Sequence, residues 1–454
     1  MIGRRSIPYL RSIVYVRNIV YLRSITSLRS NAYLGNIACL WDILRLRLLY
    51  LPVILIGISF LSISFLACIP VVQPACAAAL SAAELTAIEL PAAEPSTTGL
   101  SAKEELGKRI FFDEQLSEPK GQACSECHFP DAGFNGVGDV NITIYEGVMS
   151  GRYGFRNPQS TAYTSFSPPF HYNYMASILR RGYVGGQFWD GRAKDLVEQA
   201  KGPFLNPVEQ NNPSGEEVAR KVCQSSYANL FKEVYGMDAC DNPSAAFDMI
   251  ADAIAAYESS TESNRFSSKY DWYLKNPKKY PLSKQEAFGF EAFTKSLCFF
   301  CHSSRPGQYS DKPLFTNYTY ANMGLPKNPD NPWYNMPPSI NPAGKDFIDY
   351  GLGAIVNDHE ENGKFKVPTL RNVAVAPPYG HNGVFKSLKE VVHFYNTASF
   401  PDLWPPPEVP ENVDRIGAGD LGLTEEEEDA IVAFLKTLTD GYTPPSSSVP
   451  THSR

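Results

Sequence analysis

The chain has 454 residues, of which 43% are hydrophobic, and this length is sufficient for two or three domains with a sizeable core. The formal net charge of -7 argues against a general nucleic-acid-binding surface. Aromatic residues make up 12% of the chain, and its 36 prolines predict long ordered loops.

The N-terminal region is interpreted as a targeting segment that follows a repetitive extension. Residues 6–41 repeat a six-residue unit, as in SIPYLR and NIVYLR, which does not match the longer periods of solenoid proteins. Arg45 and Arg47 then precede an apolar run at 48–67, and small residues follow up to Ala79. This order is typical of a signal peptide, and the run is also long enough to remain as a membrane anchor. We therefore expect an exported protein, with or without a membrane tether.

Capping boxes mark the starts of three expected helices. The pattern S-x-x-E or T-x-x-E occurs at Ser101, Ser283 and Thr424, each before an apolar stretch. Further helices are expected at 194–200 and at 246–258, the second with apolar residues recurring at helical spacing. Long loops are expected at 130–169 and 303–366, and strand signals are sparse.

The pattern C-x-x-C-H occurs twice, and this spacing is typical of covalent attachment of haem c. Two thiols three residues apart can reach the two vinyl groups of one porphyrin, and the adjoining histidine can bind the iron as an axial ligand. The alternatives are a redox dithiol or half of a zinc site, but neither copy has a second cysteine pair nearby to complete four ligands. The predicted attachment residues are Cys124, Cys127 and His128, then Cys298, Cys301 and His302.

The order of helix, haem motif, long loop and closing helix occurs twice. We therefore predict an all-α fold of two tandem cytochrome c-like haem domains with long loops. Cys223 and Cys240 lie outside both motifs. In an oxidising compartment they form either a disulfide or two unpaired thiols, and the sequence leaves both alternatives open. The expected segments are a repetitive extension (1–45), a signal peptide or anchor (46–79), a linker (80–100), an N-terminal haem domain (101–270), a C-terminal haem domain (271–440) and a tail (441–454).

Four further stretches give the chain a resemblance to the bacterial di-haem cytochrome c peroxidase family, which includes the MauG-type enzymes that oxidise side chains of another protein. The resemblance covers residues 101–440. It rests on LGKRIFFDEQLS before the first haem motif, QFWDGRA at 187–193, GPFLNPVEQ at 202–210 and FKVPTLRNVAVAPPYGHNG at 365–383.

The resemblance implies that the first haem is the peroxide site, with His128 as proximal ligand. Glu209 matches a distal glutamate of the family, which would transfer a proton between the two peroxide oxygens. From the sequence alone, an exposed loop carboxylate is the simpler interpretation. Gln199 and Pro203 match other distal positions. Some family members block this iron with a histidine after the motif, but here none occurs before His171, so the resemblance implies an open iron.

The ligand opposite His302 on the second haem decides the subclass. Tyr395 lies on a helix expected after Ser387, on the same face as Leu388 and Val392. The matching residue is Met in peroxidases that accept electrons from a small cytochrome and Tyr in MauG-type enzymes. A phenolate stabilises ferric and higher-valent iron, whereas a thioether raises the potential. Tyr395 could instead pack in the core, and the competing ligands are Met323, Met336 and His381.

The resemblance also assigns residues between the haems. Trp189 matches a tryptophan that relays electrons or holes between them, although a buried aromatic has a packing role in any case. Asn157, Ala376 and Pro378 match calcium ligands, the last two through backbone carbonyls. Ala stands at a position where the family usually has Thr, and the carbonyl is retained.

The sequence thus predicts an exported di-haem peroxidase with two haems c and calcium. It would reduce hydrogen peroxide with electrons from a cytochrome c or another redox protein. The alternatives are MauG-type oxidation of a partner protein, a non-catalytic di-haem electron carrier and a membrane-tethered haem sensor. Tyr395 and the missing distal histidine favour the MauG-type branch, whereas Ser296-Leu297 weakens it, because no tryptophan precedes the second haem motif.

Overall fold

The computed structural model describes residues 99–136, 138–174, 182–415 and 417–445. All of these residues lie within one unit of the chain, Leu90–Arg454. The predicted repetitive extension, the signal peptide or anchor and nearly all of the predicted linker lie outside the described residues. Within the described ranges, no helix is both long and apolar enough to cross a membrane.

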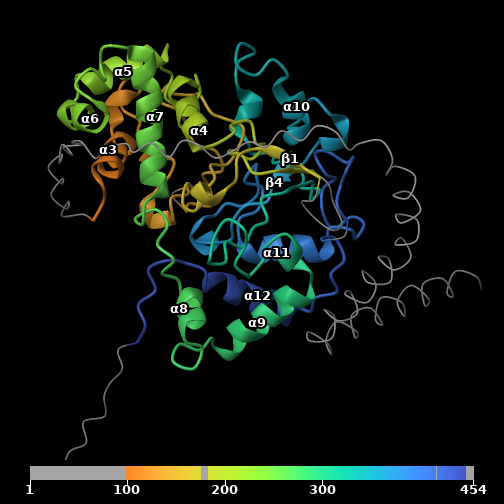
Figure 1. Ribbon diagram of the computed structural model, residues 1–454. Helices are drawn as coiled ribbons and strands as arrows, with labels where there is room; N and C mark the ends of the chain where they lie inside the picture. The colour runs from red at the N-terminus through yellow and green to blue at the C-terminus, as the bar shows by residue number, and fades with distance from the viewer. Residues whose placement is uncertain (1–98, 137, 175–181, 416, 446–454) are drawn as a thin grey trace, which may run out of the picture. The chain divides into compact units, whose positions relative to one another are not determined.

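The first half is built around one long helix, α7, against which α3, α4 and α5 pack (Figure 1). α7 begins at an Asn242 cap and buries Ile250, Ile254 and Tyr257 on the face that these neighbours cover. The burial of this apolar face stabilises helices that would be marginal in isolation. The helices of this half are α3 (Ala102–Phe111), α4 (Leu196–Leu205), α5 (Gly215–Cys223), α6 (Ala228–Tyr235) and α7 (Pro243–Ser259).

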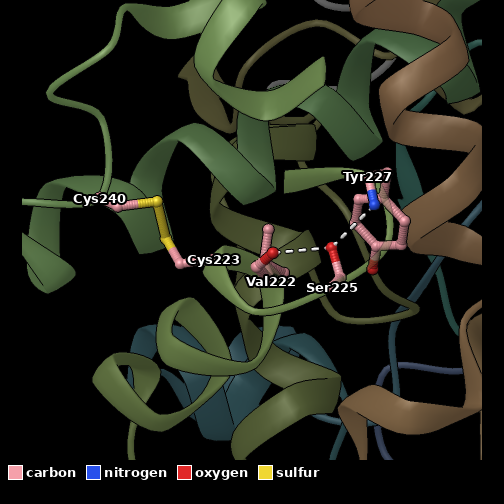
Figure 2. The surroundings of a disulfide bond; sticks show 5 residues. All are labelled: Val222, Cys223, Ser225, Tyr227 and Cys240. Atoms are coloured by element: carbon pink, nitrogen blue, oxygen red, sulfur yellow. Dashed lines mark hydrogen bonds between the residues drawn. A yellow bond between two sulfur atoms is a disulfide. The ribbon is translucent and has the colours of Figure 1, made fainter. Parts of the chain in front are cut away.

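A disulfide ties α5 to the segment before α7. Cys223, the last residue of α5, is bonded to Cys240, as Figure 2 shows. In the turn that follows α5, the Ser225 hydroxyl donates to the carbonyl of Val222 at 2.7 Å and accepts from the Tyr227 amide at 3.3 Å. The structure thereby decides between the two states that the sequence left open for these cysteines.

The second half is centred on the pair α9 and α12, which pack against each other, while α11 packs on α12. Phe293, Ile431 and Phe434 form part of its core. The helices of this half are α8 (Lys269–Lys275), α9 (Lys284–Lys295), α10 (Leu352–Val356), α11 (Leu388–Thr397) and α12 (Glu425–Lys436).

Two short antiparallel sheets lie in the loop regions. β1 (His171–Asn173) pairs with β2 (Gly182–Val184), and β3 (Tyr320–Ala321) pairs with β4 (Phe365–Lys366). A bridge between Val184 and Thr319 joins the two regions. The described chain is therefore helix-rich with little sheet.

The expected helix starts at Ser101, Ser283 and Thr424 are confirmed, because each residue caps its helix through a complete capping box. The expected end of the helix at 200 is wrong. α4 continues through Pro203 to Leu205, and Phe204 packs on Phe247 in the core. This burial offsets the backbone hydrogen bond that a proline removes.

Several elements were not expected from the sequence. α5, α6 and α8 are absent from the prediction, although Ser214 and Glu217 carry the spacing of a cap for α5. The predicted loop at 303–366 also contains α10, β3 and β4. α10, β3 and β4 are only two to five residues long, which is too short for a periodic signal in the sequence.

Candidate functional site

The two C-x-x-C-H motifs have the same backbone conformation. Each begins with one 3-10 turn, at Cys124–Glu126 and at Cys298–Phe300. In both copies the amide of the histidine donates to the carbonyl of the first cysteine, at 3.0 Å for His128 and 2.9 Å for His302. The four cysteines of the motifs are partly buried.

Both histidines are held in the tautomer that a metal ligand needs. The Nδ1 atom of His128 lies 3.3 Å from the carbonyl oxygen of Phe134, and that of His302 lies 2.8 Å from the carbonyl oxygen of Phe315. Since a carbonyl only accepts, Nδ1 must donate, and the Nε2 lone pair is left for a metal. Burial lowers the pKa of each histidine to about 4, which keeps the imidazole neutral.

The cysteines suit thioether formation with a porphyrin. Burial, followed by the charge of Glu258, raises the pKa of Cys124 to about 12, and burial also raises the pKa of Cys127 and Cys298. These groups are therefore neutral thiols, the form that adds across a vinyl group. With a neutral histidine beside each pair, the residues present fit a haem c at both motifs.

Glu209 lies beside the first motif. Its negative charge contributes to the raised pKa of both Cys124 and Cys127. The Nδ2 atom of Asn206 donates to Glu209 Oε1 at 2.7 Å, and the Val148 amide donates to the Glu209 carbonyl at 2.9 Å. Burial raises the pKa of Glu209, against the lowering effects of Arg192 and Asn206. Glu209 is half-buried and not exposed, so the interpretation as an exposed loop carboxylate is wrong.

The other predicted distal residues precede Glu209 on α4. Gln199 is partly buried, and its backbone amide donates to the backbone carbonyl of Asp195 at 3.0 Å. The carbonyl of Pro203 accepts from the amide of Gln210 at 3.1 Å, which turns the chain after the helix back towards it. α4 and this turn thus carry Gln199, Pro203 and Glu209 in one continuous segment.

Two polar residues near the first motif were missed. Gln210 places Nε2 3.7 Å from the Cys124 sulfur, and its buried Oε1 has no hydrogen-bond partner. Glu258, in the last turn of α7, is only 3% exposed, and burial raises its pKa to about 8. The sequence did contain a signal for Glu258, because it follows Ile250 and Ile254 at intervals of four on the apolar face of α7.

Tyr395 lies beside the second motif, as its position on the inner face of α11 predicted. Burial raises the pKa of its phenol, and the charges of Cys301 and Cys298 add to this effect, which places the ring near both thiols. His393, on the other face, lies 3.0 Å from Glu428 Oε1 through Nδ1.

The residues that compete with Tyr395 as the second ligand of the second haem lie in other surroundings. Met336 packs with Trp333 and Val208 in a separate cluster. His381 stacks on Phe365 with ring centroids 3.6 Å apart. Met323 is partly buried. His171, which could have blocked the first haem, is exposed on β1.

Trp189 and two of the predicted calcium residues form one hydrogen-bonded cluster. The indole Nε1 donates to the Asn157 carbonyl at 2.7 Å, and the Lys366 amide donates to the Trp189 carbonyl at 2.7 Å. Asn157 Nδ2 lies 2.7 Å from the carbonyl oxygen of Pro378. Ala376 is buried two residues earlier. Calcium ligation by Asn157 needs Oδ1 at the position of Nδ2, which is a rotation of the amide by half a turn.

Charged side chains lie next to this cluster: Asp190 and Asp349 are buried, Arg156 is half-buried and Arg192 is exposed. Arg156 donates to both carboxylate oxygens of Asp349 at 2.7 Å and to Asp190 at 2.5 Å. Arg192 also binds Asp190 at 3.0 Å and covers the Phe188 ring at 3.5 Å. Among the described residues, no three His, Cys, Asp or Glu side chains gather as metal ligands, so a calcium site here depends on amide and carbonyl oxygens.

Known proteins are similar to this chain in sequence and in structure. A model of the family described as di-haem cytochrome c peroxidase matches residues 101–279. The methylamine utilization protein MauG of Paracoccus denitrificans is 37% identical over 367 residues, which cover 77% of this chain and 90% of that protein. Cytochrome c551 peroxidase of Nitrosomonas europaea is 32% identical over 337 residues, with coverage of 74% and 79%.

A solved structure supports the same relationship. The di-haem peroxidase BthA of Burkholderia thailandensis superposes with a TM-score of 0.64 and 30% sequence identity. The match covers 76% of this chain and 87% of that one.

Proposed function

Because the chain belongs to the di-haem cytochrome c peroxidase family, a family of haem oxidoreductases with two c-type haems, we propose that it reduces hydrogen peroxide at the first haem with electrons relayed through the second. The single observation that carries this proposal is the difference between the two motifs. A half-buried carboxyl, Glu209, lies near Cys124 and Cys127, whereas a phenol, Tyr395, lies near Cys298 and Cys301.

Each haem belongs to one tandem domain in this proposal, 101–270 and 271–440. The arrangement of the helices supports this division. The first motif follows α3, which packs on α7, and the second follows α9, which packs on α12. Cys124 and Cys127 attach the first haem and His128 binds its iron. Cys298, Cys301 and His302 have the same roles in the second.

The haem supplies the iron that binds peroxide, and this chain supplies the proton transfer. Glu209 accepts a proton from one peroxide oxygen and returns it to the other, so that the leaving oxygen departs as water. Asn206 fixes the orientation of its carboxyl group. The raised pKa moves Glu209 towards the range in which a carboxyl group can both accept and donate a proton at neutral pH. Gln199 lies on the same distal side of the first haem as Glu209.

Electrons pass between the two haems through Trp189. Its indole and backbone are both hydrogen-bonded, to Asn157 and Lys366, so the ring has a fixed position. Asn157, Ala376 and Pro378 would hold a calcium ion, which would secure this segment. The electron donor is a cytochrome c or another redox protein. The disulfide between Cys223 and Cys240 supports an exported, oxidising location such as the periplasm.

MauG-type oxidation of a partner protein is the second candidate. Tyr395 favours it, because a phenolate ligand on the second iron stabilises higher oxidation states. The 37% identity to a methylamine utilization protein points the same way. A stable oxidised product after peroxide addition, decaying only when a partner protein is supplied, would select this candidate over cytochrome oxidation.

The test is an electron paramagnetic resonance spectrum of the resting holoprotein, followed by peroxide turnover of a Glu209→Gln variant. We expect one high-spin ferric haem in the wild type and a turnover of the variant reduced by about 10²- to 10⁴-fold. Glu233→Gln, at an exposed position on α6, is the matched control and retains full activity. A spectrum with only low-spin haem would contradict the open site, and full activity of Glu209→Gln would contradict the proton transfer.

A further inference from the structure

Four aromatic rings form a continuous cluster on the β1–β2 hairpin, which we call the tyrosine hairpin: Phe170, Tyr172, Tyr174 and Tyr183. Tyr172 contacts both other tyrosines, with ring centroids 5.0 Å from Tyr174 and 5.0 Å from Tyr183. Phe170 stacks on Tyr183 at 5.2 Å. Tyr174 is 71% exposed and Tyr172 is 41% exposed, so the outer end of the cluster faces solvent.

The inner end of the tyrosine hairpin reaches the segment that carries Trp189. Phe170 contacts Tyr320 edge to face at 6.0 Å. A Cβ on Gly191 would lie 2.2 Å from the Tyr320 hydroxyl and 2.7 Å from the Phe170 ring, so both side chains press against the backbone two residues after Trp189. Tyr320 also pairs in register with Lys366, whose amide binds the Trp189 carbonyl.

Packing alone does not explain the outer residues. Contacts between rings stabilise a hairpin, but phenylalanine would serve equally well, and a ring that is mostly exposed contributes little burial. The tyrosine hairpin also has carboxylates nearby that can accept a proton. Burial raises the pKa of Tyr183, and the negative charges of Glu361 and Asp358 nearby add to this effect. A tyrosine beside a carboxylate can lose a proton together with an electron.

We propose that the tyrosine hairpin is a surface site for one-electron oxidation, at which small phenols donate hydrogen atoms to Tyr172 or Tyr174. This site rests on the proposed peroxidase function, which supplies the oxidant. An electron leaves the ring of Tyr183 inwards, past Phe170 and Tyr320 towards Trp189, and the phenolic proton passes to Glu361 or Asp358. The radical then moves outwards by exchange with Tyr172 and Tyr174.

The stoichiometry of this site balances. A phenol gives one hydrogen atom to the tyrosyl radical, which restores the tyrosine and leaves a phenoxyl radical. Two such transfers supply the two electrons and two protons that reduce one hydrogen peroxide to two waters. No further oxidant or reductant is required. Phenols are favoured as substrates because their O–H bond resembles that of tyrosine and because they are small enough to reach Tyr174 from solvent.

The test uses the holoprotein mixed with one equivalent of hydrogen peroxide and frozen within milliseconds. We expect an organic radical signal in the electron paramagnetic resonance spectrum that narrows when the protein contains ring-deuterated tyrosine. The triple variant Tyr172→Phe, Tyr174→Phe, Tyr183→Phe is expected to lose this signal and the oxidation of added hydroquinone, while peroxide still changes the haem absorption as in the wild type. Phenylalanine preserves the ring contacts, so the fold is retained.

Tyr350→Phe is the matched control, because Tyr350 is also exposed, at 39%, and lies outside the cluster. It is expected to keep both the signal and hydroquinone oxidation. If the haem absorption responds to peroxide but the triple variant retains the tyrosyl signal, the hairpin is not the site and the peroxidase proposal stands. If peroxide leaves the haem absorption unchanged, the peroxidase proposal and the hairpin site are both overturned.

Discussion

The two halves of the molecule cross their helices in the same way. In the first half α3 packs on α7, and in the second half α9 packs on α12. A glycine lies at each crossing, six residues after the capping serine. A Cβ on Gly107 would lie 1.9 Å from the carbonyl oxygen of Ala253, and a Cβ on Gly289 would lie 1.7 Å from that of Ala430. Only a residue without a side chain allows this approach.

The same scaffold supports different chemistry in each half. Five residues after the contacted alanine, the first half has Glu258, whereas the second half has Leu435, and both are buried. The first motif thus has two carboxyl groups nearby, the buried Glu258 and the half-buried Glu209, while the second has the phenol of Tyr395. Helix packing is conserved between the halves because it depends on backbone distance. The facing side chains can change because they do not affect that distance.

The largest expected effect concerns Glu258. Burial raises its pKa from an ordinary 4.5 to about 8, so it stays protonated in the folded protein over a pH range where the unfolded chain ionises. Stability is therefore unaffected below about pH 4.5 and falls as the pH rises to about 8, by about 5 kcal/mol. Glu258→Gln should remove this dependence and be more stable than the wild type at pH 9, as measured by denaturant unfolding.

The control for Glu258 is Glu233→Gln, which changes an exposed glutamate in the same half. It should leave the pH profile as in the wild type. Leu435→Gln in the second half should destabilise equally at all pH values, since it buries an amide that does not titrate. Parallel pH profiles for wild type and Glu258→Gln would show that Glu258 titrates normally.

The next effect tests whether the two crossings are equivalent. Gly107→Ala and Gly289→Ala should each lower the free energy of unfolding by about 3 kcal/mol, because the new methyl group meets backbone atoms that cannot move without separating the helices. Gly202→Ala, within α4, is the matched control. Its Cβ would lie 3.4 Å from the Phe188 ring, and the better helix propensity of alanine should leave stability equal or higher.

Equal losses at Gly107 and Gly289 would support equivalent crossings. A loss at one position only would show that one half adjusts its helix pair and that the comparison fails there.

The smallest effect on the fold concerns Tyr395. Tyr395→Met should leave the fold intact and raise the reduction potential of the second haem, because a thioether ligand favours ferrous iron more than a phenolate does. The high-spin signal of the first haem should be unchanged. Spectroelectrochemical titration of the holoprotein measures both, with Tyr273→Met as control, because Tyr273 packs against the core of the same half. Unchanged potentials in Tyr395→Met would exclude Tyr395 as a ligand.

The sequence predicted the elements that have strong local signals. The capping boxes at Ser101, Ser283 and Thr424 gave the correct helix starts, since a cap depends on residues within one turn. α6 lacks a side-chain cap, and β3 and β4 have two residues each, so no local pattern marked them. The end of α4 was misplaced because the packing of Phe204 on Phe247 is a contact between distant residues.

By itself, the sequence determined what is covalent and local: two C-x-x-C-H motifs, the helices before and after them, and the resemblance carried by four short stretches. Only the tertiary structure decided which side chains face each motif. Glu209 lies half-buried near the first motif, Tyr395 lies near the second, Glu258 is enclosed by α7 and its neighbours, and Cys223 is bonded to Cys240. The physical reason is that burial and electrostatic proximity depend on contacts between residues far apart in the chain, and spacing along the sequence does not encode such contacts.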